Sequence, residues 1–289
     1  MANSALRWWV KKGARQGVLL SSWLSGGLAV SALMAPGPQV RVLTYHRFGT
    51  IPRDPFCVSE ADFDRQIEHL ARTKTAVSLE DVLAFLENGK ELPPDAVLVT
   101  MDDGYRSTKT IAHKVLRRHG VPAIAFVTPS LIDAGEAAGG KPIEDGPEPY
   151  LTWDELREIA DEGMTIGSHS WTHRSMGSFS LDEAADEARR SKEALERELR
   201  RPVLSYAYPY GTRADYSEEI AKRVAAAGYK VAFTSQHGPV RPGLEPFMLP
   251  RIKIEAGEGQ LAFQLATRGG LDAWRLVDQT MWRLQTVNR

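Results

Sequence analysis

Cysteine is almost absent from this chain of 289 residues, which contains only Cys57. A single cysteine excludes an intramolecular disulfide framework and a cluster of thiolate metal ligands. Because Cys57 follows a Pro-Phe pair and has no adjacent basic or histidine residue, we expect a buried or half-buried thiol rather than a nucleophile.

The chain also lacks an excess of charge of either sign, since it contains 36 Lys and Arg residues and 37 Asp and Glu residues. Nothing in this balance indicates a nucleic-acid partner. No internal repeat is visible. Hydrophobic residues make up 43% of the chain, as in ordinary globular proteins, and the length suffices for one large domain or two small ones.

Long uncharged runs are scarce, and the one near the N-terminus covers residues 17–34 behind a basic flank that includes Lys11 and Lys12. This pattern is typical of a signal peptide or signal anchor, although serines and glycines dilute it. The Trp8-Trp9 pair suits a membrane interface. We expect residues 1–38 to form a basic and apolar anchor, with a removed signal or a helix packed on the domain as alternatives. The expected location is the cell envelope, associated with the membrane; peripheral attachment in the cytoplasm is the alternative.

Strand and helix patterns alternate after the Pro36-Gly37-Pro38 break. Strands are predicted over 40–45, 76–79, 97–100, 122–127, 165–167, 203–207, 231–234 and 247–254, and helices over 59–73, 80–88, 105–119, 152–163, 181–200 and 215–227. Segment 133–149, rich in Gly, Glu, Ala and Pro, predicts a long surface loop. The alternation predicts an α/β fold with a parallel sheet, open or closed into a barrel. We assign residues 39–256 to this domain and 257–289 to an amphipathic helical tail.

Two adjacent carboxylates, Asp102 and Asp103, follow the apolar run 97–101. Charges at the end of a buried strand repel each other unless a metal or a cation compensates. His169 and His173, four residues apart, can reach one ion and, with one of the carboxylates, make the three-ligand site of a catalytic zinc centre. The other carboxylate can then take a proton from water. The alternative, that both aspartates only cap the next helix, leaves the histidine pair unexplained.

The polar candidates all follow predicted strands. They are His46, Asp102, Asp103, His169, His173, Tyr208 and Tyr210. The carboxyl ends of parallel strands in a barrel share one face, and that face carries the active site. We therefore expect these side chains to meet.

Three segments resemble the motifs of the polysaccharide deacetylases, the NodB-like enzymes of carbohydrate esterase family 4. Segment 100–104 (TMDDG) resembles the first motif, 168–173 (SHSWTH) the second and 207–211 (AYPYG) the third. Segment 249–251 (LPR) is a sequence often seen near the end of such domains. The Tyr-His pair at 45–46 resembles that of the subgroup acting on poly-N-acetylglucosamine. The resemblance covers about residues 40–255 and implies an irregular (β/α)7–8 barrel.

The resemblance also implies a hydrolase acting on linear amide C–N bonds, which removes N-acetyl groups from N-acetylhexosamine units of an envelope or exported polysaccharide. Asp103, His169 and His173 would hold a divalent metal, with zinc as the expected ion. Asp102 would be the general base, and the metal and the backbone N–H of Tyr210 would stabilise the oxyanion. For the general acid, we favour His46 over His237, which we expect to be a solvent-exposed loop residue.

One departure from the family pattern concerns Ala207, because many members have an arginine there that pairs with the base aspartate. We hypothesise that Arg251 supplies this cation. The expected partners are an N-acetylated glycan, on whose sugar rings Tyr208 and Tyr210 could stack, and a membrane surface. Two alternatives remain open, namely removal of another acyl or formyl group from a lipid-linked sugar and a non-catalytic glycan-binding relic of the fold.

Overall fold

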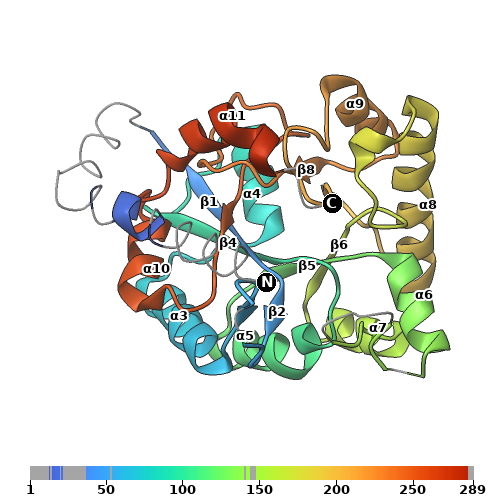
Figure 1. The fold of residues 1–289 in the computed structure, drawn as a ribbon, viewed down its shortest axis with the longest axis horizontal. Helices are drawn as coiled ribbons and strands as arrows, with labels where there is room; N and C mark the ends of the chain where they lie inside the picture. The colour runs from blue at the N-terminus through green and yellow to red at the C-terminus, as the bar shows by residue number, and fades with distance from the viewer. Residues whose placement is uncertain are drawn as a thin grey trace.

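The computed structural model describes residues 13, 15–19, 21, 37–52, 54–139, 141–143 and 148–285 (Figure 1). Most of the apolar run expected over 17–34, and most of its basic flank, lie outside the described residues, so the prediction for residues 1–38 stays a prediction. In the part that is described, no helix has both the length and the hydropathy that a membrane span requires.

Seven parallel strands form the main sheet, in the hydrogen-bonded order β8-β7-β6-β5-β4-β1-β9. They are β1 (Val40–Tyr45), β4 (Ala96–Met101), β5 (Ala123–Val127), β6 (Thr165–Ser168), β7 (Ser205–Ala207), β8 (Val231–Phe233) and β9 (Ile252–Lys253). Leu249 bridges Phe233 of β8, and Ile252 pairs with Leu43 of β1, so the segment around β9 connects β1 with β8, the strand at the opposite edge of the sheet. The prediction of an α/β fold with an irregular barrel is therefore confirmed.

Helices surround the curled sheet, with α3 and α10 near β1 and with α6, α7 and α8 on the side of β5 and β6 (Figure 1). They are α3 (Glu60–Thr73), α4 (Leu79–Asn88), the π-helix η1 (Thr108–His113), α5 (Lys114–His119), α6 (Pro129–Ala137), α7 (Trp153–Asp161), the 3-10 helix η2 (Met176–Ser178), α8 (Leu181–Leu199), α9 (Glu218–Ala226), α10 (Gly259–Thr267) and α11 (Trp274–Gln285). Capping boxes begin three of them, at Ser78, Thr152 and Ser180.

Some local predictions were wrong. Segment 76–79 contributes only an isolated bridge between Ala76 and Val97. The first part of the predicted loop 133–149 belongs to α6, which has Pro129 at its first turn and buries Ile132. A small parallel ribbon of β2 (Arg47–Phe48) and β3 (Cys57–Val58) was not predicted, because two residues a strand carry no periodicity. Cys57 is buried, and burial raises its pKa, which agrees with a structural thiol.

Alternation along β4 determines where the first aspartate lies. Ala96 and Leu98 point inward, into the smaller apolar cluster that joins the strands to α4, whereas Val97 and Val99 pack in the larger cluster with other helices. Thr100 and Asp102 continue the inward series, because both contact the buried Arg251. The strand period thus carries the Asp102 side chain into the end of the barrel.

Candidate metal centre and active site

Asp103, His169 and His173 bring three ligand atoms together, all within 4.8 Å of one another. Asp103 Oδ1 lies 3.4 Å from His169 Nε2 and 3.1 Å from His173 Nε2. A tetrahedral zinc ion with bonds of about 2.0–2.2 Å places its ligands roughly 3.3–3.6 Å apart. Two imidazoles and one carboxylate at these distances fit a divalent metal and leave a position for water or substrate.

The tautomer of His169 suits this role. Its Nδ1 lies 2.8 Å from the carbonyl oxygen of Ala207, which can only accept a hydrogen bond. The proton is therefore on Nδ1, and the lone pair of Nε2 faces Asp103. A second hydrogen bond of this kind is how proteins orient metal-binding imidazoles. Here the third sequence motif holds a ligand of the second motif.

Asp103 occupies a backbone conformation with φ of 74°, and Gly104 follows with φ of 76°. A Cβ on Gly104 would lie 3.1 Å from Val127 Cγ1, so this turn requires glycine for both space and conformation. Burial acts to raise the pKa of Asp103, but the neighbouring His169 and His173 outweigh it and hold that pKa well below its usual range. Asp103 is thus ionised and could serve as a metal ligand.

Asp102 pairs with Arg251 and lies at the edge of the ligand cluster, 3.9 Å from His169 Nε2. The Arg251 Nη1 and Nη2 groups donate to Oδ1 and Oδ2 of Asp102, at 2.7 and 2.8 Å. Arg251 also donates to the Thr234 carbonyl and to Thr100 Oγ1. Burial acts to raise the pKa of Asp102, but Arg251 and His169 oppose it and the pKa is lowered. Arg251 therefore supplies the cation beside Asp102 that the uncharged Ala207 cannot provide.

His46 follows β1, and its ring lies 4.8 Å from the ring of Phe56. Burial lowers its pKa to about 4, although the charges of Asp103 and Asp102 act in the opposite direction. The imidazole is therefore neutral near pH 7. Its Nδ1 is buried without a hydrogen-bond partner among the described residues, which leaves one ring nitrogen for a ligand.

His237 differs from the sequence expectation, because it is buried rather than exposed. Its backbone N–H and Nδ1 both bond to Asp278 of α11, at 2.7 and 2.9 Å, and its Nε2 lies 3.2 Å from Arg15. Arg15 in turn donates to Glu258. His237 therefore belongs to a buried network that joins the C-terminal helix to the barrel.

The two tyrosines of the third motif have different surroundings. Tyr208 is buried, and its hydroxyl donates to the Phe247 carbonyl, so the expectation that it stacks on a sugar is wrong. Tyr210 is 47% exposed, and its ring lies 5.3 Å from that of His173. Tyr210 and Gly211 both have positive φ, at 61° and 62°, in the turn that follows β7. Tyr210 can therefore contact a bound glycan.

The sequence did not point to Tyr150, which precedes α7 and stacks on Tyr105 with ring centroids 4.9 Å apart. Arg47 of β2 donates to the Tyr105 hydroxyl at 3.0 Å. Burial raises the pKa of Tyr105, and the charge of Asp103 raises it further. Arg47, Tyr105 and Tyr150 thus form a connected group of side chains near Asp103. The signal in the sequence that could have pointed to Tyr150 was its position directly after the predicted loop 133–149.

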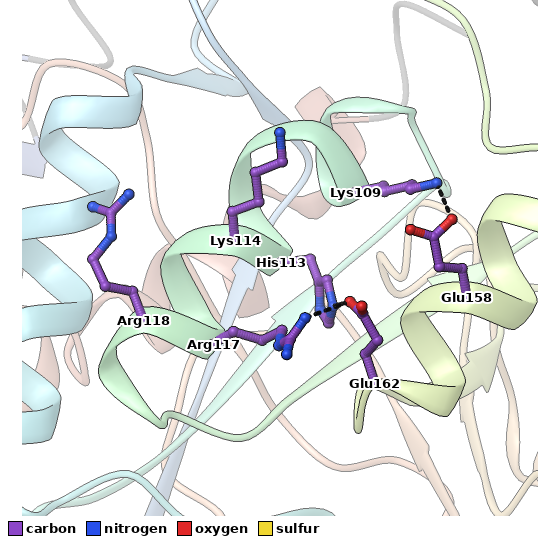
Figure 2. A pocket seen from close by; sticks show the side chains of 7 residues that line it. All are labelled: Lys109, His113, Lys114, Arg117, Arg118, Glu158 and Glu162. Carbon is purple, nitrogen blue, oxygen red and sulfur yellow. Dashed lines mark hydrogen bonds and ion pairs between the residues drawn. The ribbon is translucent and has the colours of Figure 1, made fainter.

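A crevice of about 470 Å³ lies elsewhere, in the outer helical layer between η1, α5 and α7 (Figure 2). It is lined by Lys109, His113, Lys114, Arg117, Arg118, Glu158 and Glu162. Lys109 pairs with Glu158, and Arg117 pairs with Glu162 at 2.8 Å. The crevice contains none of the predicted site residues, and ion pairs already compensate much of its charge.

Comparison with known proteins agrees with this geometry. A family model described as polysaccharide deacetylase matches residues 89–232, which include both aspartates and both histidines. YxkH of Bacillus subtilis, named as a polysaccharide deacetylase, is 26% identical over 178 residues, which are 62% of this chain and 58% of YxkH. The poly-beta-1,6-N-acetyl-D-glucosamine N-deacetylase of Escherichia coli is 31% identical over 99 residues, 33% of this chain and 15% of that protein.

Among solved structures, the deacetylase PplD of Streptococcus pyogenes has a similar fold, with a TM-score of 0.66 and 24% identity. That match covers 75% of this chain and 93% of PplD. The chain spans less than two thirds of the length of the curated relatives described above. The family model covers both aspartates and both histidines, and the structure brings these residues together at the carboxyl ends of the strands. The chain therefore belongs to the polysaccharide deacetylase family.

Proposed function

We propose that the protein is a metal-dependent hydrolase that removes N-acetyl groups from N-acetylhexosamine units of an envelope or exported polysaccharide. The observation that carries this proposal is the convergence of Asp103, His169 and His173 next to the buried Asp102–Arg251 pair. This arrangement combines a three-ligand centre with a separate ionised carboxylate. When bound, a divalent cation supplies polarisation of the amide carbonyl and stabilisation of developing negative charge.

Asp102 is the proposed general base. Arg251 binds both of its oxygens and lowers its pKa, so the carboxylate is ionised and held in one orientation near pH 7. It accepts a proton from the water that attacks the amide carbon. The backbone N–H of Tyr210, in the turn after β7, is the proposed donor to the oxyanion.

His46 is the proposed general acid. An amine leaves only after its nitrogen is protonated, because an amide anion is a poor leaving group. As an imidazolium, the form that the charges of Asp103 and Asp102 favour, His46 can pass a proton to the amine nitrogen as the C–N bond breaks, and it then returns to the neutral imidazole. The products are then acetate and a free amino sugar. His237 is engaged by Asp278 and Arg15, which supports His46 over it.

Three finer proposals accompany this function. Zinc is the proposed native ion, because two imidazoles and one carboxylate are typical of catalytic zinc. Poly-N-acetylglucosamine is the proposed substrate class, supported by the Tyr-His pair at 45–46 and by the name of the Escherichia coli relative. Envelope location with membrane association, and the division into 1–38, 39–256 and 257–289, are supported by the sequence pattern alone.

The test is acetate release from N-acetylglucosamine oligomers by the zinc-loaded protein, with Asp102→Asn as the inactive control. We expect release by the parent protein and at least a 100-fold loss in the variant. Release only from acylated or formylated lipid-linked sugars would redirect the substrate assignment. Zinc binding without hydrolysis of any acylated sugar would favour a glycan-binding protein instead.

A further inference from the structure

The two histidine ligands are joined by a short and strained loop. Only three residues separate His169 from His173, and both Ser170 and His173 have positive φ, at 65° and 62°. One hydrogen bond within the loop, from the His173 N–H to Ser170 Oγ, is 3.0 Å long. Non-glycine residues in this conformation persist only where the surroundings hold them. The loop therefore needs support from outside itself.

Glu187 of α8 provides such support. Its Oε2 accepts the backbone N–H groups of Trp171 and Thr172, at 3.1 and 2.9 Å. The Thr172 hydroxyl donates to the same carboxylate at 3.1 Å. Glu187 is 6% exposed, so a buried carboxylate is satisfied here by donors from the middle of the ligand loop.

Two neighbours of Glu187 on α8 also contact the histidine segment. The Arg190 guanidinium lies 4.5 Å from the ring centre of Trp171, and the Ser191 and Ser168 hydroxyls lie 2.7 Å apart. Positions 187, 190 and 191 are spaced by three and four residues, so they share one face of the helix. This face contacts the segment before His169 and between the two ligands.

We propose that Glu187 is a positioning residue for the metal centre, which fixes the loop so that the two imidazoles converge on Asp103. The inference rests on the metal site of the proposed function. Partners that orient metal ligands without touching the metal affect affinity about 10- to 100-fold when removed. Glu187 differs from them in that it holds the backbone between two ligands rather than an imidazole nitrogen.

The experiment is a zinc titration against a chromophoric chelator, with the apo-protein monitored by thermal unfolding. We expect Glu187→Ala to weaken zinc binding about 10- to 100-fold. Glu187→Gln keeps an acceptor for both N–H groups and is expected to stay within about threefold of the parent. Glu193→Ala removes the same charge from an exposed position of α8 and serves as the matched control.

The outcomes separate the two proposals. If the parent protein does not bind zinc more tightly than His173→Ala, the metal site itself fails. If the parent binds zinc and Glu187→Ala binds it equally well, only the positioning role is overturned. Equal losses in Glu187→Ala and Glu187→Gln would assign the effect to charge and overturn it as well. If Glu187→Ala does not fold, Thr172→Val carries the test, with an expected loss of about fivefold; an unchanged affinity there overturns the proposal.

Discussion

Arg251 and Asp102 form a buried two-point ion pair, in which each carboxylate oxygen accepts one guanidinium N–H at 2.7 or 2.8 Å. Arg251 is 1% exposed and Asp102 is 3% exposed. The fork of donors fixes the plane of the carboxylate, which a lysine ammonium cannot do. The pair lies beside the ligand cluster but contributes no ligand to it, so its removal separates proton transfer from metal binding.

Arg251→Met tests this separation. We expect turnover to fall about 100-fold or more, because Asp102 loses the cation that keeps it ionised and oriented. Zinc content is expected to change little, and stability to fall by about 3–5 kcal/mol, since a buried carboxylate is left unpaired. Acetate release and metal content of the purified variant are the measurements. Unchanged turnover would falsify the assignment of Arg251.

Removal of the metal is the second test. A chelator is expected to abolish acetate release, and added zinc to restore it, because the ligands themselves cannot polarise the amide carbonyl. His173→Ala is expected to weaken zinc binding at least 100-fold, since it deletes one of three ligands. His113→Ala makes the same change in the outer crevice, where His113 contacts Glu162, and should bind zinc normally. Equal affinities for the two variants would contradict the site.

The third prediction concerns stability and pH in the metal-free protein. Burial lowers the pKa of His46 to about 4 from the ordinary value of 6.5. Between these values the unfolded chain binds a proton that the folded chain does not, so the free energy of unfolding decreases as pH falls. At pH 5 this loss is about 2 kcal/mol. We expect His46→Gln to lack it, as measured by urea unfolding at pH 7.5 and pH 5. A variant whose stability falls as steeply as that of the parent would refute the prediction.

The positions of the ligands followed from the sequence because they depend on strand ends. Asp103 and His169 come directly after β4 and β6, and parallel strands present their carboxyl ends at one face. Hydrophobic runs such as 97–101 mark those ends without any knowledge of tertiary structure. Arg251 lies just before β9, so its contact with Asp102 depends on the segment that crosses from β8 to β9 and not on the end of a strand.

Other features depend on contacts between distant segments, which local patterns do not contain. The sequence around His237 resembles an exposed loop, but Asp278, 41 residues later, buries and pairs it. Glu187 belongs to a highly charged helix, whose sequence predicts a solvated face, and yet it contacts the ligand loop. The π-helical turn of η1 likewise has no signature in the periodicity of 105–119.

The network around His237 leads to the last prediction, that α11 stabilises the domain. Asp278 is 2% exposed and accepts both the backbone N–H and the Nδ1–H of His237. Asp278→Ala leaves these buried donors unsatisfied, which costs about 1–3 kcal/mol. We expect a decrease in Tm of several degrees, on the order of 2–4 °C per kcal/mol, with zinc affinity unchanged. Asp182→Ala, at a position 97% exposed, is the matched control and should leave Tm nearly unchanged. Equal Tm values for the two variants would show that α11 contributes little to the stability of the barrel.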